Sequence, residues 1–226
     1  MASRSRRSNR PMRRHDMVYV GPRAWRMLLA TRGDLAAAPL LARWVDSGWP
    51  LVARRAMPNE GEGVALGLPL PPSAGKRRLS FLMQPGDVVA TAPPPALRAV
   101  RRAAPRAWWS TLDALGEMAL RHRVEASVFG SLAWQALTGL DYLTERSDLD
   151  VLLHVRRETD LHRLAAALAA IEQAAPMRID GEFIRLDGAA VNWREFHAGV
   201  RRIMVKSAGG VGLLDASRFL AAPVPS

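Results

Sequence analysis

The chain has 226 residues, 49% of them hydrophobic, and a formal net charge of +11, so its length suffices for one large domain or two small ones with a buried core. It has no cysteine, which excludes disulfides, thiolate metal sites and thiol nucleophiles. No apolar run approaches the roughly 18 residues of a membrane span, and the arginine-rich start lacks the apolar segment of a secretory signal, so we expect a cytoplasmic protein without a membrane partner.

The first 14 residues form a basic segment. They hold six arginines and no acidic residue, whereas all 21 acidic residues lie beyond them. Without this segment the chain remains basic, but by less than half the excess. We expect residues 1–14 to be a disordered, solvated tail, and the alternative is an arm that contacts a polyanion.

Residues 15–90 are predicted to form a small α+β domain with short elements separated by turns. Apolar positions recur at helical spacing in two segments, and apolar runs bounded by glycine, proline or charged residues indicate three strands. The expected helices cover 22–29 and 40–45, and the expected strands cover 51–55, 64–70 and 79–83.

Residues 91–95 are predicted to be a linker, because three consecutive prolines suit neither a helix interior nor a central strand. Beyond it, residues 96–226 are predicted to form a second α/β domain, with a mixed sheet and flanking helices. The expected helices cover 105–122, 132–138 and 159–175, the expected strands 123–129 and 148–155, and a hairpin 177–196.

Two carboxylates, Asp148 and Asp150, stand at the start of the second of these strands. Alternate side chains of a strand share a face, with Cα atoms about 7 Å apart, so both carboxylates can reach one pair of divalent cations about 4 Å apart. The apolar residues 151–153 follow at once, and acids at the mouth of a buried strand are costly unless a cation or hydrogen bonds compensate them. We favour a metal site over two ordinary surface aspartates.

Gly130 and Ser131 lie between a predicted strand and a predicted helix. A helix that begins there offers unpaired backbone N–H groups to a phosphate, and glycine lets the backbone approach the anion closely. The alternative is a plain strand-to-helix turn with Ser131 as the N-cap, a role that is compatible with phosphate binding.

A third carboxylate would complete a two-cation site. We favour Asp180 on the next strand, with Glu182 close behind and Glu195 as a more distant candidate. Among the basic residues, the cluster around Lys76 and Arg78 is the best candidate for contacting substrate phosphates, against the alternative of solvated surface charges.

These motifs resemble those of the malonate decarboxylase holo-acyl-carrier-protein synthases, also called phosphoribosyl-dephospho-CoA transferases, of the nucleotidyltransferase superfamily. The glycine-serine step with the Asp-x-Asp pair is shared by that whole superfamily, whereas the intervening Trp-Gln-Ala-Leu-Thr-Gly at 134–139 is more specific. The resemblance covers nearly the whole chain beyond the tail, including segments 14–18, 50–55, 66–72, 76–79, 180–182, 192–195 and 205–206.

The resemblance implies a nucleotidyltransferase-like C-terminal domain and a defined reaction. Such an enzyme transfers phosphoribosyl-dephospho-CoA from triphosphoribosyl-dephospho-CoA to a serine of the apo acyl-carrier subunit of malonate decarboxylase, and pyrophosphate leaves. In this chain Asp148, Asp150 and Asp180 would hold Mg²⁺ or Mn²⁺, and Gly130 and Ser131 would hold the pyrophosphate end. Domain 15–90 would then contact the substrate or the carrier.

Two alternatives remain. The same chemistry could serve another hydroxyl acceptor, such as the carrier of citrate lyase. The second is a non-catalytic basic protein that binds nucleic acid, suggested by the high isoelectric point. We do not expect a nucleic-acid partner, because much of the basic excess lies in the tail and the acidic residues gather where a metal would bind.

Overall fold

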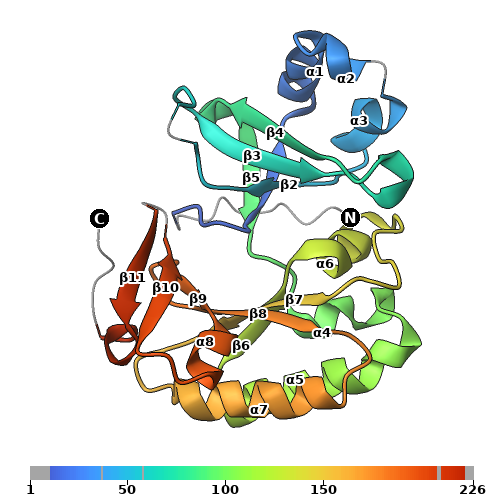
Figure 1. Cartoon of the computed structure of the whole chain (residues 1–226). Coiled ribbons are helices and arrows are strands. Elements are labelled where there is room, and N and C mark those ends of the chain that lie inside the picture. Colours follow the sequence, from blue (N-terminus) through green and yellow to red (C-terminus); the bar gives the residue numbers. More distant parts are fainter. Residues whose placement is uncertain (1–10, 37, 58, 208–209, 222–226) are drawn as a thin grey trace. The chain divides into compact units, whose positions relative to one another are not determined.

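The computed structural model of this chain describes residues 11–36, 38–57, 59–207 and 210–221 (Figure 1). The chain divides into two compact units, Met1–Pro94 and Pro95–Ser226, each with its own sheet. This confirms the predicted mixed α/β class. Within the described residues, no helix is both long enough and apolar enough to cross a membrane.

Most of the predicted basic tail, residues 1–10, lies outside the described residues. Residues 11–14 are described. The Arg13 backbone N–H donates to the carboxylate of Asp16 at 2.8 Å, and Asp16 is buried. The described end of the segment is therefore joined to the start of the first strand.

The first unit contains a five-stranded, wholly antiparallel sheet in the order β4-β3-β2-β1-β5. The three predicted strands are present, but β1 and β5 were not predicted. The strands are β1 (Met17–Val20), β2 (Leu51–Ala53), β3 (Val64–Pro69), β4 (Arg78–Met83) and β5 (Val88–Ala92), and the helices are α1 (Pro22–Ala30), α2 (Gly33–Ala36) and α3 (Pro39–Trp44).

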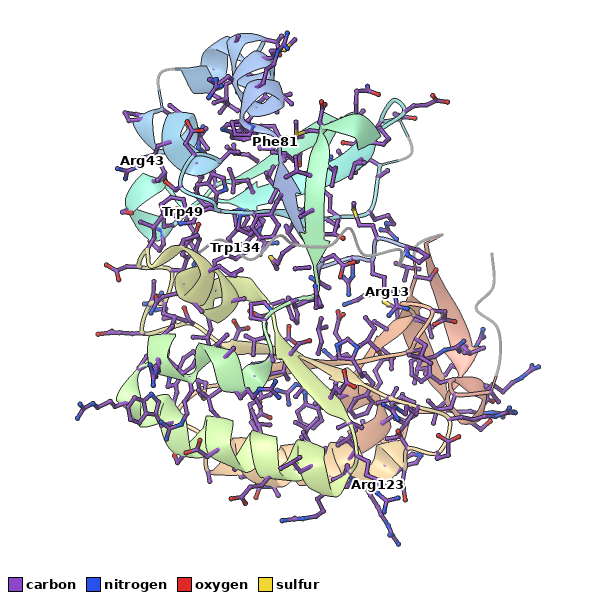
Figure 2. The ribbon with its side chains drawn as sticks, turned by 180° about the vertical axis from the view of Figure 1, so that it is seen from behind. Arg13, Arg43, Trp49, Phe81, Arg123 and Trp134 are labelled. Atoms are coloured by element: carbon purple, nitrogen blue, oxygen red, sulfur yellow. The ribbon has the colours of Figure 1, made fainter. Side chains whose placement is uncertain are left out.

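Tryptophans join the helices of this unit to each other and to the sheet. The Trp25 ring of α1 packs edge-on against Phe81 of β4 (Phe81 is labelled in Figure 2), with centroids 5.1 Å apart. The Trp25 indole N–H donates to the Leu41 carbonyl of α3 at 2.8 Å. Trp44 of α3 packs against Trp49 in the same way, at 4.9 Å. The indole rings thus bury a large apolar surface, and the buried N–H of Trp25 still has a hydrogen-bond acceptor.

The predicted linker is shorter than expected. Thr91 and Ala92 belong to β5 and pair with Val18 and Met17 of β1. The strand ends at Ala92, and Pro93, which follows, has no N–H to continue the ladder. The linker prediction was therefore wrong by two residues at its start.

The second unit contains a six-stranded mixed sheet in the order β11-β10-β9-β8-β7-β6. Strands β7 and β8 are parallel and joined by helix α7, and the other neighbours are antiparallel. The strands are β6 (Glu125–Val128), β7 (Leu149–His154), β8 (Ile179–Ile184), β9 (Ala190–Asn192), β10 (Arg202–Lys206) and β11 (Val211–Asp215). The helices are α4 (Leu97–Val100), α5 (Trp109–Arg121), α6 (Gly130–Thr138), α7 (Leu161–Gln173) and α8 (Trp193–His197).

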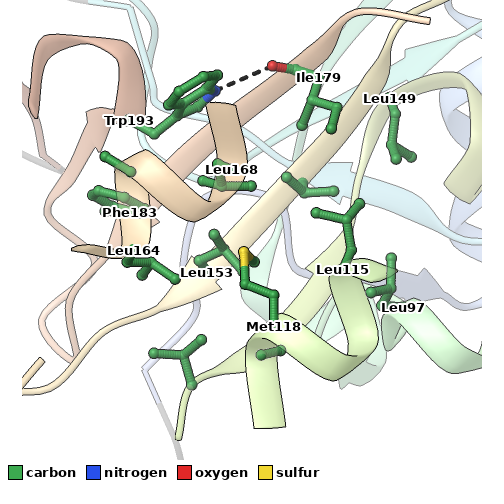
Figure 3. Close-up of a cluster of buried hydrophobic side chains, with 14 of the residues drawn as sticks. Leu97, Leu115, Met118, Leu149, Leu153, Leu164, Leu168, Ile179, Phe183 and Trp193 are labelled. Carbon is green, nitrogen blue, oxygen red and sulfur yellow. Dashed lines mark hydrogen bonds between the residues drawn. The ribbon is translucent and has the colours of Figure 1, made fainter. Parts of the chain in front are cut away.

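Helices α5 and α7 lie side by side on one face of this sheet (Figure 1). Alternate residues of β7, among them Leu149 and Leu153, point into the core between helices and sheet, together with Leu168 of α7 (Figure 3). The intervening residues, including Asp150, therefore belong to the opposite face of the sheet. The apolar core fixes which face carries the acids.

Two local predictions for this unit were wrong. Residues 193–196 are not the second strand of a hairpin but the helix α8, because the Asn192 side chain accepts the Arg194 N–H and caps a helix there. Ser131 is not the N-cap that the alternative made it, because α6 begins at Gly130, two residues before the predicted start at 132, with Phe129 in the capping position. Gly130 is thus itself the first residue of α6.

Replacing Leu168 with alanine should destabilise the second unit, since the side chain is fully buried between α7 and the sheet. The expected loss in free energy of unfolding is about 2–5 kcal/mol, from lost apolar burial and the remaining cavity. Urea unfolding followed by circular dichroism would measure it. The control is Leu120→Ala on α5, a leucine that is 81% exposed, and equal losses in both variants would contradict the predicted core.

Candidate active site

Three aspartates lie close together where strands β7 and β8 of the second sheet begin. Asp150 of β7 lies directly beside Asp180 of β8 in the parallel register, and Asp148 immediately precedes β7. One carboxylate oxygen from each lies within 4.8 Å of the other two, and all three residues are half-buried. An all-oxygen set of this kind suits a hard divalent cation such as Mg²⁺. The donors present therefore fit a metal. Within the described part of the chain, no other group of three or more histidine, aspartate or glutamate side chains could hold one in this way.

The start of α6 lies so close to this cluster that a side chain on its first residue would clash. Gly130 has a φ of +63°, and a Cβ built on it would lie 1.7 Å from Oδ2 of Asp150. The Phe129 N–H donates to the Asp150 carbonyl at 3.1 Å, which fixes the approach. Only glycine can bring the backbone this near to the carboxylate, and the first N–H groups of α6 follow at once.

Asp180 is held by the segment that follows β8. The Asn192 amide Nδ2 donates to Asp180 Oδ1 at 3.1 Å. One residue before Asp180, the Ile179 carbonyl accepts from the Trp193 indole at 3.1 Å (Figure 3) and from Arg194 at the same distance. Backbone and carboxylate are therefore held by separate contacts.

The two glutamates that are alternative candidates for the third carboxylate form hydrogen bonds with other groups. Glu182 is 5% exposed and its Oε1 accepts from the Lys206 ammonium at 2.8 Å. Glu195 accepts the Met204 N–H at 2.7 Å. Neither belongs to the cluster of three, so Asp180 is the residue that the fold brings to Asp148 and Asp150.

Lys76 and Arg78 belong to the first unit. Both are exposed, Lys76 on the turn between β3 and β4 and Arg78 at the first position of β4, opposite Pro69. Their contact with substrate phosphates stays a prediction, as do the roles assigned to Gly130 and Ser131.

The sequence reading missed the residues that support Asp180. Asn192, Arg194 and Glu172 lie on three elements, and their contacts depend on how α7 and α8 pack. One signal was present in the sequence. Asn192 is followed three residues later by Glu195, a spacing that is typical of a helix start. It indicates α8, but not what the Asn192 amide contacts.

The comparisons with known proteins agree over both units. Residues 13–94 match the family model described as the phosphoribosyl-dephospho-CoA transferase MdcG N-terminal domain, and residues 96–217 match the corresponding C-terminal domain. The chain belongs to the phosphoribosyl-dephospho-CoA transferase family. All three aspartates, Gly130 and Ser131 lie in the segment that matches the C-terminal domain of this family.

Individual proteins of this name align with the chain over most of their length. A phosphoribosyl-dephospho-CoA transferase of Bradyrhizobium diazoefficiens is 56% identical over 220 residues, covering 97% of each chain. One of Xanthomonas campestris pv. campestris is 38% identical over 179 residues, 79% of this chain and 84% of the relative. One of Pseudomonas putida is 32% identical over 206 residues, 90% and 93% of the two chains. No solved structure gives a significant match.

The substitution Gly130→Ala should separate close approach from backbone strain in this transferase. Both Gly130 and Gly139, at the two ends of α6, have positive φ, but a Cβ on Gly139 meets nothing within 4 Å. Gly139→Ala should therefore cost only about 1–2 kcal/mol of stability from left-handed strain. Gly130→Ala should displace Asp150 and lower the transfer rate by about 100-fold or more. Equal rates in the two variants would contradict the importance of this approach.

Glu172 and Arg194 should make stability depend on acid. The hydrogen bond from Arg194 lowers the pKa of Glu172 below its ordinary 4.5, and the Ile179 N–H adds to the effect. A carboxyl group with a lowered pKa stabilises the fold above its unfolded pKa, and the contribution disappears as pH falls through the folded value. Between pH 7 and pH 3, Glu172→Gln should therefore lose less free energy of unfolding than the wild type.

Urea unfolding at both pH values would measure this difference. The matched control is Glu117→Gln, an exposed glutamate on α5. It should lose as much stability on acidification as the wild type. If Glu172→Gln does the same, the ion pair has no part in the acid dependence.

Proposed function

We propose that this protein transfers phosphoribosyl-dephospho-CoA from triphosphoribosyl-dephospho-CoA to a serine on the apo acyl-carrier subunit of malonate decarboxylase, with release of pyrophosphate. The observation that carries the proposal is the meeting of Asp148, Asp150 and Asp180 at the glycine-led start of α6, in a chain that belongs to this transferase family. Acids that can hold a cation and N–H groups that can hold phosphate are the two needs of such a transfer.

The three aspartates would hold Mg²⁺ or Mn²⁺. A divalent cation bound there would neutralise charge on the phosphate chain and polarise the phosphorus that is attacked. Carboxylates from two adjacent strands and from the residue before β7 supply oxygen ligands, which such cations prefer. Their half-buried position shields the charges from bulk water and strengthens the interaction with a cation.

The chain's own residues then supply positioning. The first N–H groups of α6, at Gly130 and Ser131, bind phosphate oxygens at the pyrophosphate end. Lys76 and Arg78 are the basic residues that we propose to contact further phosphate oxygens of the substrate. The serine oxygen forms a bond to phosphorus as the bond to the pyrophosphate oxygen breaks, and the serine proton passes to a carboxylate base. Catalysis of this kind rests on orientation and charge neutralisation.

The acceptor hydroxyl is identified by its own experiment. The aspartate cluster would serve equally for another hydroxyl, such as the carrier of citrate lyase. A direct assay distinguishes the malonate decarboxylase carrier from the citrate lyase carrier as acceptor. Protein, triphosphoribosyl-dephospho-CoA and Mg²⁺ are mixed with each apo carrier in turn, and intact-protein mass spectrometry measures the gain in carrier mass while pyrophosphate is quantified. Modification of the malonate decarboxylase carrier is expected.

Replacing Asp148, Asp150 or Asp180 with alanine should reduce transfer by orders of magnitude, because each change removes one carboxylate from the cluster. The matched control is Asp113→Ala on α5, an exposed aspartate paired with Arg101, which should keep the wild-type rate. Appreciable transfer by the Asp148 or Asp150 variant would refute the metal assignment. A near-normal rate for the Asp180 variant would contradict its role as the third ligand.

Deleting residues 1–14 tests the alternative that the protein binds nucleic acid and has no transferase activity. A transferase should keep its turnover without the six arginines of this segment, whereas a nucleic-acid-binding protein should lose most of its affinity.

A further inference from the structure

The side-chain amide of Asn192 makes two hydrogen bonds, and the one at its oxygen determines which atom faces Asp180. It ends β9, next to β8, and its Nδ2 donates to Asp180 Oδ1 at 3.1 Å. Its Oδ1 accepts the Arg194 N–H at 3.0 Å. Because a backbone N–H can only donate, the oxygen of the amide must face Arg194 and the NH₂ group must face Asp180.

The backbone next to Asp180 is held separately. Glu172 of α7 accepts the Ile179 N–H at 2.7 Å and pairs with the Arg194 guanidinium through both of its oxygens. The guanidinium also donates to the Ile179 carbonyl. The hydrogen bond to Glu172 raises the pKa of Arg194, and the charge of Asp180 adds to it. The start of β8 is thereby fixed between α7 and α8, and the side-chain torsions of Asp180 remain to be set.

Asparagine is the residue type that meets both demands at position 192. Aspartate and serine cap a helix about as well as asparagine. Aspartate, however, would bring a fourth carboxylate to Asp180, and serine is too short to contact it while capping α8. Only the amide can accept from the helix and donate to a cation-binding carboxylate at the same time.

We propose that Asn192 is a positioning residue for the metal site: its amide, oriented by the start of α8, holds the Asp180 carboxylate in place beside Asp148 and Asp150. The proposal rests on the metal-dependent function proposed above. Groups that hydrogen-bond to metal ligands orient them, and their removal typically weakens metal binding about 10- to 100-fold.

The test measures Mn²⁺ binding by electron paramagnetic resonance, with no substrate or carrier present. Asn192→Ser keeps the cap of α8 and removes the donor to Asp180, so Mn²⁺ should bind about tenfold more weakly. Asp160→Ser is the matched control, because Asp160 caps α7 through the Arg163 N–H. It exchanges a capping residue in the same way, away from the cluster, and should bind Mn²⁺ as the wild type does. Wild-type affinity in Asn192→Ser would overturn the proposal.

Asn192→Thr provides a second variant, should Asn192→Ser fail to fold. Its hydroxyl can also cap α8 and is likewise too short to contact Asp180. Mn²⁺ should therefore bind about tenfold more weakly than in the wild type and raise the thermal midpoint less. An equal rise in both proteins would overturn the proposal.

These readouts separate the two proposals. If the wild type binds Mn²⁺, Asn192→Ser binds it more weakly, and neither carrier is modified, the positioning role stands and the proposed transfer fails. If the wild type transfers the group and both Asn192 variants bind Mn²⁺ as the wild type does, the transfer stands and the positioning role fails. A wild type without Mn²⁺ binding at millimolar concentration would overturn the positioning role.

Discussion

Three carboxylates whose oxygens lie within 4.8 Å of one another repel, and the structure of the second unit has to hold them together against that repulsion. It does so from the opposite face of the sheet. Leu149, Val151 and Leu153 are buried among the helices, so the residues between them are forced to the other side. The apolar core therefore supplies the free energy that keeps the acids in one place. The hydrogen bond from Asn192 to Asp180 and the backbone hydrogen bond from Phe129 to Asp150 then refine their orientation.

The acidic pair and its partner strand could be predicted because they rest on short-range regularities. Alternation along a strand places Asp148 and Asp150 on one face, and an apolar run marks a buried strand. The next predicted strand carries Asp180, and the structure places this residue in register with Asp150. Its preference over Glu182 had no physical basis in the sequence. The lysine that pairs with Glu182 lies 24 residues away along the chain, on β10.

Other features were hidden from the sequence for identifiable reasons. Strands β1 and β5 are short and pair only with segments far along the chain, so no local pattern reveals them. Residues 193–196 include aromatic residues that favour a strand, and the side-chain cap of Asn192 overrides that preference. Gly130 was chosen for its approach to a phosphate. The structure shows that glycine is also required by a neighbouring carboxylate, which depends on the exact spacing of β7 and α6.

The parallel pairing of β7 and β8 has a consequence for how such a chain can vary in length. The connection between the two strands passes through α7, on the far side of the sheet, and additional residues in its loops would leave the register of Asp150 and Asp180 unchanged. A single residue inserted between Asp180 and the buried Phe183 would instead turn the carboxylate toward the apolar core. Insertions and deletions should thus be tolerated in the loops around α7. They should not be tolerated in β8 between Asp180 and Phe183.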